Sequence, residues 1–191
     1  VEPVSLADYR VVEWQLGRPP RGAFRVSARC MHQFPQVICV HPLVAGKPFP
    51  TMYWLTCPFL RREISTLEAA GEVGRLEALM KRDRQLHDAM HRAHERYIQQ
   101  RNALLSAEQI ARLEAHGLLT GLMQRGIGGI REFSHIKCLH VHVAHALVDE
   151  NPVGKIVRQS LPREACSSEE RICSAYSGGG ADRSGSVVGG V

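Results

Sequence analysis

The stretch TMYWLTCPFLRREISTL, residues 51–67, decides the fold class of this chain. Its first six residues are rich in β formers, which predicts a strand. From Pro58 the hydrophobic period changes from two to 3.6, because Leu60, Ile64 and Leu67 fall at i, i+4 and i+7. Proline also suits the first turn of a helix, where a missing N–H costs nothing. A strand followed directly by a helix is typical of a fold that mixes both elements.

The segment before this junction predicts two more strands. Residues 24–28 alternate between apolar and polar side chains, and residues 36–40 are rich in β-branched residues. Prolines punctuate the region, and the short spacing favours a small antiparallel meander over residues 23–57.

The segment after the junction is helical. Residues 73–104 form a long, charged helical region, in which His87, His91 and His94 lie among charged residues and indicate a solvated face. Ser106, with Gln three positions later, forms a capping box that opens a further helix.

These patterns predict an α+β fold, with a small antiparallel sheet in the N-terminal half covered by several helices. We expect a flexible N-terminal arm over residues 1–22 and a single α+β domain over residues 23–160. The Gly- and Ser-rich composition near the C-terminus predicts a disordered tail over residues 161–191.

Composition narrows the class of protein. The chain has 191 residues, of which 44% are hydrophobic and 23% charged, and this is typical of a globular protein. It has no apolar run of membrane-spanning length and no signal-like start, so we expect a cytoplasmic protein without membrane contact. The net charge of +5 comes from 24 basic and 19 acidic residues that are interspersed, which disfavours nucleic-acid binding.

A run of histidines and cysteines carries the main chemical signal. A final helix is predicted from about Ile130 to Val148, and on it Cys138, His142 and His145 fall at i, i+4 and i+7, opposite an apolar stripe. Nitrogen and sulfur ligands one turn apart can bind one metal ion, and a mixed thiolate and imidazole set favours Zn, with Fe as the alternative.

The remaining ligand would come from another element. Cys57, at the junction of strand and helix, is the first choice, and Cys30 with His32 is the next. Two other interpretations stay open. The His/Cys face can be an ordinary solvated surface, or Cys138 can be a nucleophile with His142 as its base.

A glycine-rich turn gives a weaker signal. Gly126, Gly128 and Gly129 precede the predicted final helix, where free N–H groups would favour an anion, although a plain turn is the simpler interpretation. The turn lacks the Walker spacing, so no nucleotide cofactor is predicted.

Several of these segments together resemble a bacterial family, the domain-of-unknown-function family 501, over roughly residues 24–158. The segments that carry the resemblance are Arg29-Cys30, Pro48-Phe49-Pro50-Thr51, Tyr53-Trp54-Leu55-Thr56-Cys57-Pro58, Leu67-Glu68 with Gly71, Gly126-Ile127-Gly128-Gly129, Lys137-Cys138-Leu139-His140-Val141-His142 and Asn151-Pro152-Val153-Gly154.

The resemblance implies cysteines at positions 30, 57 and 138 and histidines at positions 140 and 142, which strengthens the metal hypothesis. Some members have a second cysteine where this chain has His32. The family has no established activity, and its members are expected to be cytoplasmic. Their genes often lie beside those of a septum-formation initiator and an exopolyphosphatase, which implies a partner in division or polyphosphate metabolism.

The leading hypothesis is a metal-binding protein with Cys57, Cys138 and His142 as core ligands, joined by Cys30 or His145. The first alternative is a metal-free interaction protein that presents its charged helices to a partner. The second is a hydrolase or transferase that acts on a phosphorylated anion through the glycine turn and nearby Arg and His.

Overall fold

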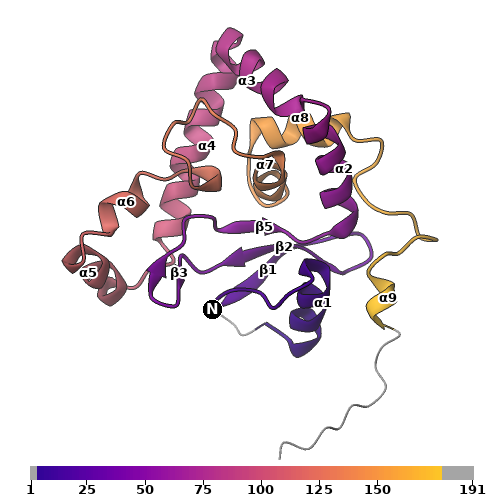
Figure 1. The fold of residues 1–191 in the computed structure, drawn as a ribbon, viewed down its shortest axis with the longest axis horizontal. Helices are drawn as coiled ribbons and strands as arrows, with labels where there is room; N and C mark the ends of the chain where they lie inside the picture. Colours follow the sequence, from indigo (N-terminus) through magenta and orange to yellow (C-terminus); the bar gives the residue numbers. More distant parts are fainter. Residues whose placement is uncertain (1–3, 178–191) are drawn as a thin grey trace, which may run out of the picture.

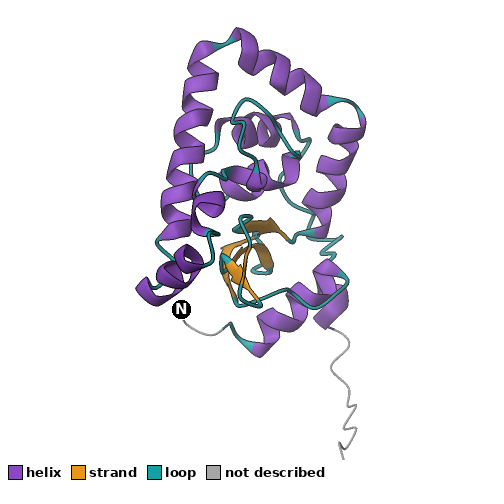
Figure 2. Ribbon diagram, turned by 60° about the vertical axis from the view of Figure 1, so that its left-hand side comes forward, coloured by secondary structure: helices purple, strands orange, loops and turns teal. Residues whose placement is uncertain are grey.

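The computed structural model describes residues 4–177 and has an α+β fold, as predicted (Figures 1 and 2). Its elements are α1 (Leu6–Leu16), β1 (Phe24–Arg29), β2 (Pro35–Val40), β3 (Leu43–Val44), β4 (Lys47–Pro48), β5 (Tyr53–Leu55), α2 (Pro58–Ala69), α3 (Glu72–Arg82), α4 (Arg84–Asn102), α5 (Ala107–Ala115), α6 (Leu119–Met123), the 3₁₀ turn η1 (Ile127–Gly129), α7 (Leu139–Ala146), α8 (Pro152–Ser160) and α9 (Ser174–Ser177). None of the helices in the described range is long and apolar enough to span a membrane.

The sheet has the strand order β1-β2-β5, and both pairings are antiparallel, as the sequence predicts. The short β3–β4 hairpin is inserted before the last strand. All residues of β2 are buried, because the two faces of this central strand pack on different layers. Val37 and Cys39 belong to the main core beneath the helices, whereas Ile38 and Val40 pack with Val12 of α1 on the other face.

Several helices cover the face of the sheet opposite α1 and surround α7. Figure 1 shows α7 in the middle of the molecule, with α4 and α2 on its two sides and the sheet beneath it. The predicted helix from Pro58 is confirmed, and so is the capping box between Ser106 and Gln109. The predicted long helical region is divided at Asp83, whose side chain accepts a hydrogen bond from the N–H of Leu86 at 3.0 Å and starts α4.

The predicted start of the final helix is wrong. It begins at Leu139 and not near Ile130, and Cys138 just before it has extended backbone angles of φ −163° and ψ 156°. Carboxylates on other helices accept the backbone N–H groups of this segment, because Glu77 binds the N–H of Ile136 at 2.8 Å and Glu68 binds that of Leu139 at 2.5 Å. Spacing along a helix therefore does not relate Cys138 to the residues after it.

The expectation of a flexible N-terminal arm is wrong for residues 6–16, which form α1; residues 1–3 lie outside the described range. The Ser5 hydroxyl accepts a hydrogen bond from the N–H of Asp8 at 3.1 Å and caps the helix. Val12 is fully buried against the sheet, and Asp8 pairs with Arg29 of β1 at 2.7 Å. The Pro- and Arg-containing segment of residues 17–22 follows this helix.

The expectation of disorder from residue 161 onward is also wrong for residues 161–177. Cys166 and Cys173 are buried, although they are far apart from the sheet in sequence. The His32 Nε2 lies 3.0 Å from the carbonyl oxygen of Cys166, and Gln15 Nε2 donates to Cys173 Sγ at 3.2 Å. Contacts with the end of the sheet therefore order this segment, while residues 178–191 lie outside the described range.

The packing of α1 gives a testable prediction. Val12→Ala should reduce the free energy of unfolding by about 2 kcal/mol, because it leaves a cavity between helix and sheet. The matched control is Leu6→Ala, since Leu6 lies on the same helix and is 66% exposed; its effect should be within about 0.5 kcal/mol. Urea denaturation measures both, and equal effects would contradict the packing of α1 on β2.

Candidate functional site

The candidate site lies at the N-terminus of α7, where three chain segments meet. Glu68, near the end of α2, directs its carboxylate to this helix end and accepts the N–H of Leu139. A carboxylate is favoured here because the first N–H groups of a helix lack intrahelical partners and carry partial positive charge. This cap brings the side chains of Cys138 and His140 beside Glu68.

Glu68, Cys138 and His140 form a group of metal-ligating side chains. Their ligand atoms lie within 4.8 Å of one another, and all three residues are half-buried. Within residues 4–177 this is the one set of at least three His, Cys, Asp or Glu side chains that meets this spacing. Carboxylate, thiolate and imidazole are all ligands that Zn²⁺ takes in proteins.

His140 has an acceptor at each ring nitrogen. Its Nδ1 lies 3.1 Å from Glu68 Oε1, and its Nε2 lies 3.1 Å from the carbonyl oxygen of Arg61. When the ring is doubly protonated it can donate to both acceptors at once. The hydrogen bond with Cys138 and the nearby Glu68 charge raise the pKa of His140 above its ordinary value of 6.5, against the effect of burial.

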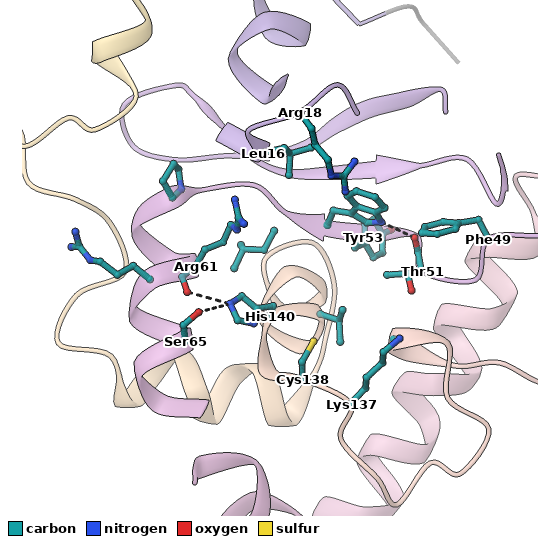
Figure 3. A pocket seen from close by; sticks show the side chains of 16 residues that line it. Leu16, Arg18, Phe49, Thr51, Tyr53, Arg61, Ser65, Lys137, Cys138 and His140 are labelled. Atoms are coloured by element: carbon teal, nitrogen blue, oxygen red, sulfur yellow. Dashed lines mark hydrogen bonds between the residues drawn. The ribbon is translucent and has the colours of Figure 1, made fainter. Parts of the chain in front are cut away.

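Two members of the group, Cys138 and His140, line a cleft of about 770 Å³ (Figure 3). Lys137 lines it beside them, whereas Glu68 is not among its lining residues. Arg61 of α2 and Arg18, just after α1, line the same cleft. The group can therefore act on a molecule that enters from solvent.

The three core ligands predicted from the sequence are not brought together. Cys138 lies at the cleft, whereas Cys57 is buried where α2 begins, and burial raises its pKa to about 11. Cys30 and His32 lie in the turn between β1 and β2, near the same end of the sheet as Cys57. Cys138 therefore lies at the cleft, whereas Cys30 and Cys57 lie near one end of the sheet.

His142 and His145 lie in the core instead of on a face shared with Cys138. Both side chains are fully buried. The Nδ2 of Asn151 lies 3.3 Å from His142 Nδ1 and 3.2 Å from His145 Nδ1. The Asn151 Oδ1 accepts the N–H of Gly154, so the amide nitrogen faces both rings and the Nδ1 atoms act as acceptors. These histidines are therefore neutral, with the proton on Nε2.

His94 is a third buried histidine, although the sequence predicts it on a solvated face. Its Nδ1 accepts the N–H of Ile127 at 3.0 Å, and its ring stacks on Phe133 with centroids 4.4 Å apart. Burial lowers the pKa of His94 to about 3, and it lowers those of His142 and His145 to about 4. These rings stay neutral at physiological pH.

The glycine segment forms a turn that packs closely on its neighbours. The N–H of Gly126 donates to Ile130 O at 2.8 Å, and that of Gly129 donates to Gly126 O at 2.9 Å. A side chain at Gly126 would collide with His94, which explains the glycine there. Gly128 has a φ of 71° and lines the cleft. The segment does not directly precede an α-helix, contrary to the sequence-based expectation.

Two contributors to the site were missed by sequence reasoning. Glu68 occurs in a motif that supports the family resemblance, but a glutamate in a charged helix carries no mark of a ligand. Arg61 lies in a mixed run of charges with Arg62 and Glu63, which carries no mark of a ligand, yet it lines the cleft. The signal that identifies both is their position on α2 opposite α7, and this position depends on tertiary packing.

The buried histidines predict acid sensitivity. We expect the free energy of unfolding to fall as the pH drops from 6.5 toward 4. In this range the three histidines bind protons in the unfolded chain but stay neutral in the folded one, because burial lowers their pKa values. Each ring contributes a slope of up to about 1.4 kcal/mol per pH unit.

Urea unfolding at several pH values, in the presence of a chelator, measures this slope. His94→Asn keeps an acceptor near the Nδ1 position. It should reduce the pH dependence of the free energy of unfolding by the contribution of about one proton. His87→Asn is the control, because the side chain of His87 is 43% exposed. An unchanged slope in His94→Asn would contradict the neutral buried state of this ring.

The comparisons with known proteins agree with the resemblance seen in the sequence. A search of the curated proteins and a search of the solved structures returned no match. The model of the family described as "Protein of unknown function (DUF501)" matches residues 26–159, which include the cleft residues Arg61, Cys138 and His140. Since this match covers more than half of the chain, the protein belongs to the DUF501 family.

Proposed function

We propose that this protein binds a Zn²⁺ ion through Glu68, Cys138 and His140, with an open coordination position that faces the cleft. The observation that carries the proposal is the convergence of carboxylate, thiol and imidazole within 4.8 Å, with the thiol and the imidazole lining the cleft. This mixed donor set favours Zn²⁺ over Fe.

The surroundings of His140 fit a metal ligand. Histidines that bind metals usually donate their other ring N–H to a carbonyl or carboxylate, which fixes the tautomer. The carbonyl of Arg61, 3.1 Å from Nε2, supplies this partner and leaves Nδ1, on the side of Glu68, for the ion. The proton on Nδ1 must then leave, so zinc binding and protonation of His140 compete.

Three protein ligands beside an accessible cleft are typical of catalytic zinc sites, whereas structural sites are closed by four. The ion would supply Lewis acidity to a bound water or to an oxygen of the substrate. Hydrolysis is the reaction class that this chemistry favours, and the cationic cleft favours an anionic substrate.

Zinc content tests the proposal. The untagged full chain should retain about one zinc per chain after gel filtration, measured by plasma mass spectrometry. Glu68→Gln, Cys138→Ser and His140→Gln should each lose it, and the apparent zinc affinity of the wild type should rise with pH through the raised pKa of His140. Glu68→Gln keeps an acceptor for the N–H of Leu139, so the helix cap survives.

Two controls separate this site from other places. His135→Asn changes an exposed histidine, whose side chain is 60% exposed, and Cys30→Ser changes a ligand that the sequence predicted; both should keep zinc. Loss of zinc in Cys30→Ser with retention in Cys138→Ser would move the site to the end of the sheet. Wild-type protein without zinc would overturn the proposal.

A second candidate function rests on the pair of Cys138 and His140 alone. A cysteine just before a helix N-terminus and beside a protonatable histidine is the arrangement of an activated thiol nucleophile. In chelator-treated protein, iodoacetamide should then modify Cys138 faster than Cys30, and His140→Gln should slow the reaction at Cys138. Equal rates at the two cysteines would exclude this function.

A further inference from the structure

The cleft that Cys138 and His140 line carries positive charge on part of its lining. Arg18, Arg61, Arg62 and Lys137 contribute this charge, and no aspartate or glutamate is among the lining residues in the described part of the chain. Over the whole chain acidic and basic residues are interspersed, with 19 acidic residues against 24 basic ones. A concave surface with charges of one sign concentrates ligands of the opposite sign.

Two of these cations, Arg61 and Lys137, flank Cys138 and His140 in the lining of the cleft. In Figure 3, Cys138 and His140 lie between Arg61 and Lys137. Arg61 uses one nitrogen to donate to the carbonyl of Gln15 at 2.8 Å, which holds its guanidinium in position. No carboxylate within residues 4–177 forms an ion pair with Arg61 or Lys137.

Aromatic rings line another part of the same cleft. Phe49 and Trp54 have ring centroids 5.6 Å apart, and the Trp54 Nε1 donates to the carbonyl of Thr51 at 3.0 Å. The polar atom of the indole is thus already bonded within the protein, and the rings contribute apolar surface to the cleft. The guanidinium of Arg18 lies 5.3 Å from the Trp54 ring centroid and places positive charge at this wall.

We infer that the cleft binds a small phosphate monoester, whose planar group lies against Phe49 and Trp54 and whose phosphate lies between Arg61 and Lys137. A volume of about 770 Å³ suits a ligand of this size. Several separate cations suit a phosphate, with its dianionic charge and three oxygens, better than they suit a ligand with a single carboxylate. The inference deepens the proposed function, on which it rests for the ion beside the phosphate, and it names the class of substrate.

Isothermal titration with simple probes tests the inference. Phenyl phosphate should bind the full chain at least about tenfold more tightly than either inorganic phosphate or phenol, because it alone engages both parts of the cleft. Lys137→Gln should weaken binding of phenyl phosphate by about tenfold. Lys81→Gln, the same charge change at an exposed position outside the cleft, should leave it unchanged.

A second variant separates the aromatic wall from the cations. Phe49→Leu keeps an apolar side chain but removes the ring, so it should weaken phenyl phosphate by about threefold to tenfold and leave inorganic phosphate unaffected. Benzoate that binds as tightly as phenyl phosphate would overturn the assignment of a phosphate. Equal binding to wild type and Lys137→Gln would overturn the assignment of the cleft.

The titration is made with zinc-loaded and chelator-treated protein, so that the two proposals fail separately. Zinc retained by the wild type, without binding of phenyl phosphate to either form, would overturn this inference alone. Binding of phenyl phosphate by a chain that retains no zinc would support the cleft assignment and overturn the zinc site.

Discussion

Helix α7 lies inside the molecule, and the polar groups along it need partners within the protein. Glu68 accepts the N–H of Leu139 at its first turn. The Asn151 amide nitrogen lies on the Nδ1 atoms of the buried His142 and His145, whose Nε2 atoms have no hydrogen-bond partner among the described residues. Gly154 lets α8 approach closely, because a side chain there would collide with the carbonyl of His142. An unpaired polar group in such a place costs about 1–3 kcal/mol, so the packing of α2, α7 and α8 depends on these contacts.

The contact that caps α7 also builds the candidate site. Glu68 holds both the N–H of Leu139 and the ring of His140, and the extended backbone at Cys138 turns its thiol toward the same place. A glutamate that supports the fold is therefore also a ligand candidate. A zinc ion would replace a proton on His140 as the positive charge beside Glu68, which links metal binding to pH at this helix end.

Patterns within a few residues of one another predicted much of the fold. The alternation in residues 24–28, the proline at position 58 and the capping box at Ser106 each reflect a local preference of the backbone, and the structure has the elements they predict. The helix α1 and the segment 161–177 were missed, because contacts with the sheet order them and those contacts involve residues far away in the chain.

For the candidate site, the sequence determined the types of residue but not their grouping. It predicted Cys138 as a ligand and an α+β fold around it, whereas His140 was indicated only by the family resemblance. Only the tertiary structure placed Glu68 beside them, moved His142 into the core and left Cys57 at another end of the sheet. The physical reason is that the predicted ligand spacing assumed a helix that includes Cys138, whereas α7 begins at Leu139. The hydrogen bonds of Glu77 and Glu68, on other helices, to the N–H groups of Ile136 and Leu139 hold the backbone at this start.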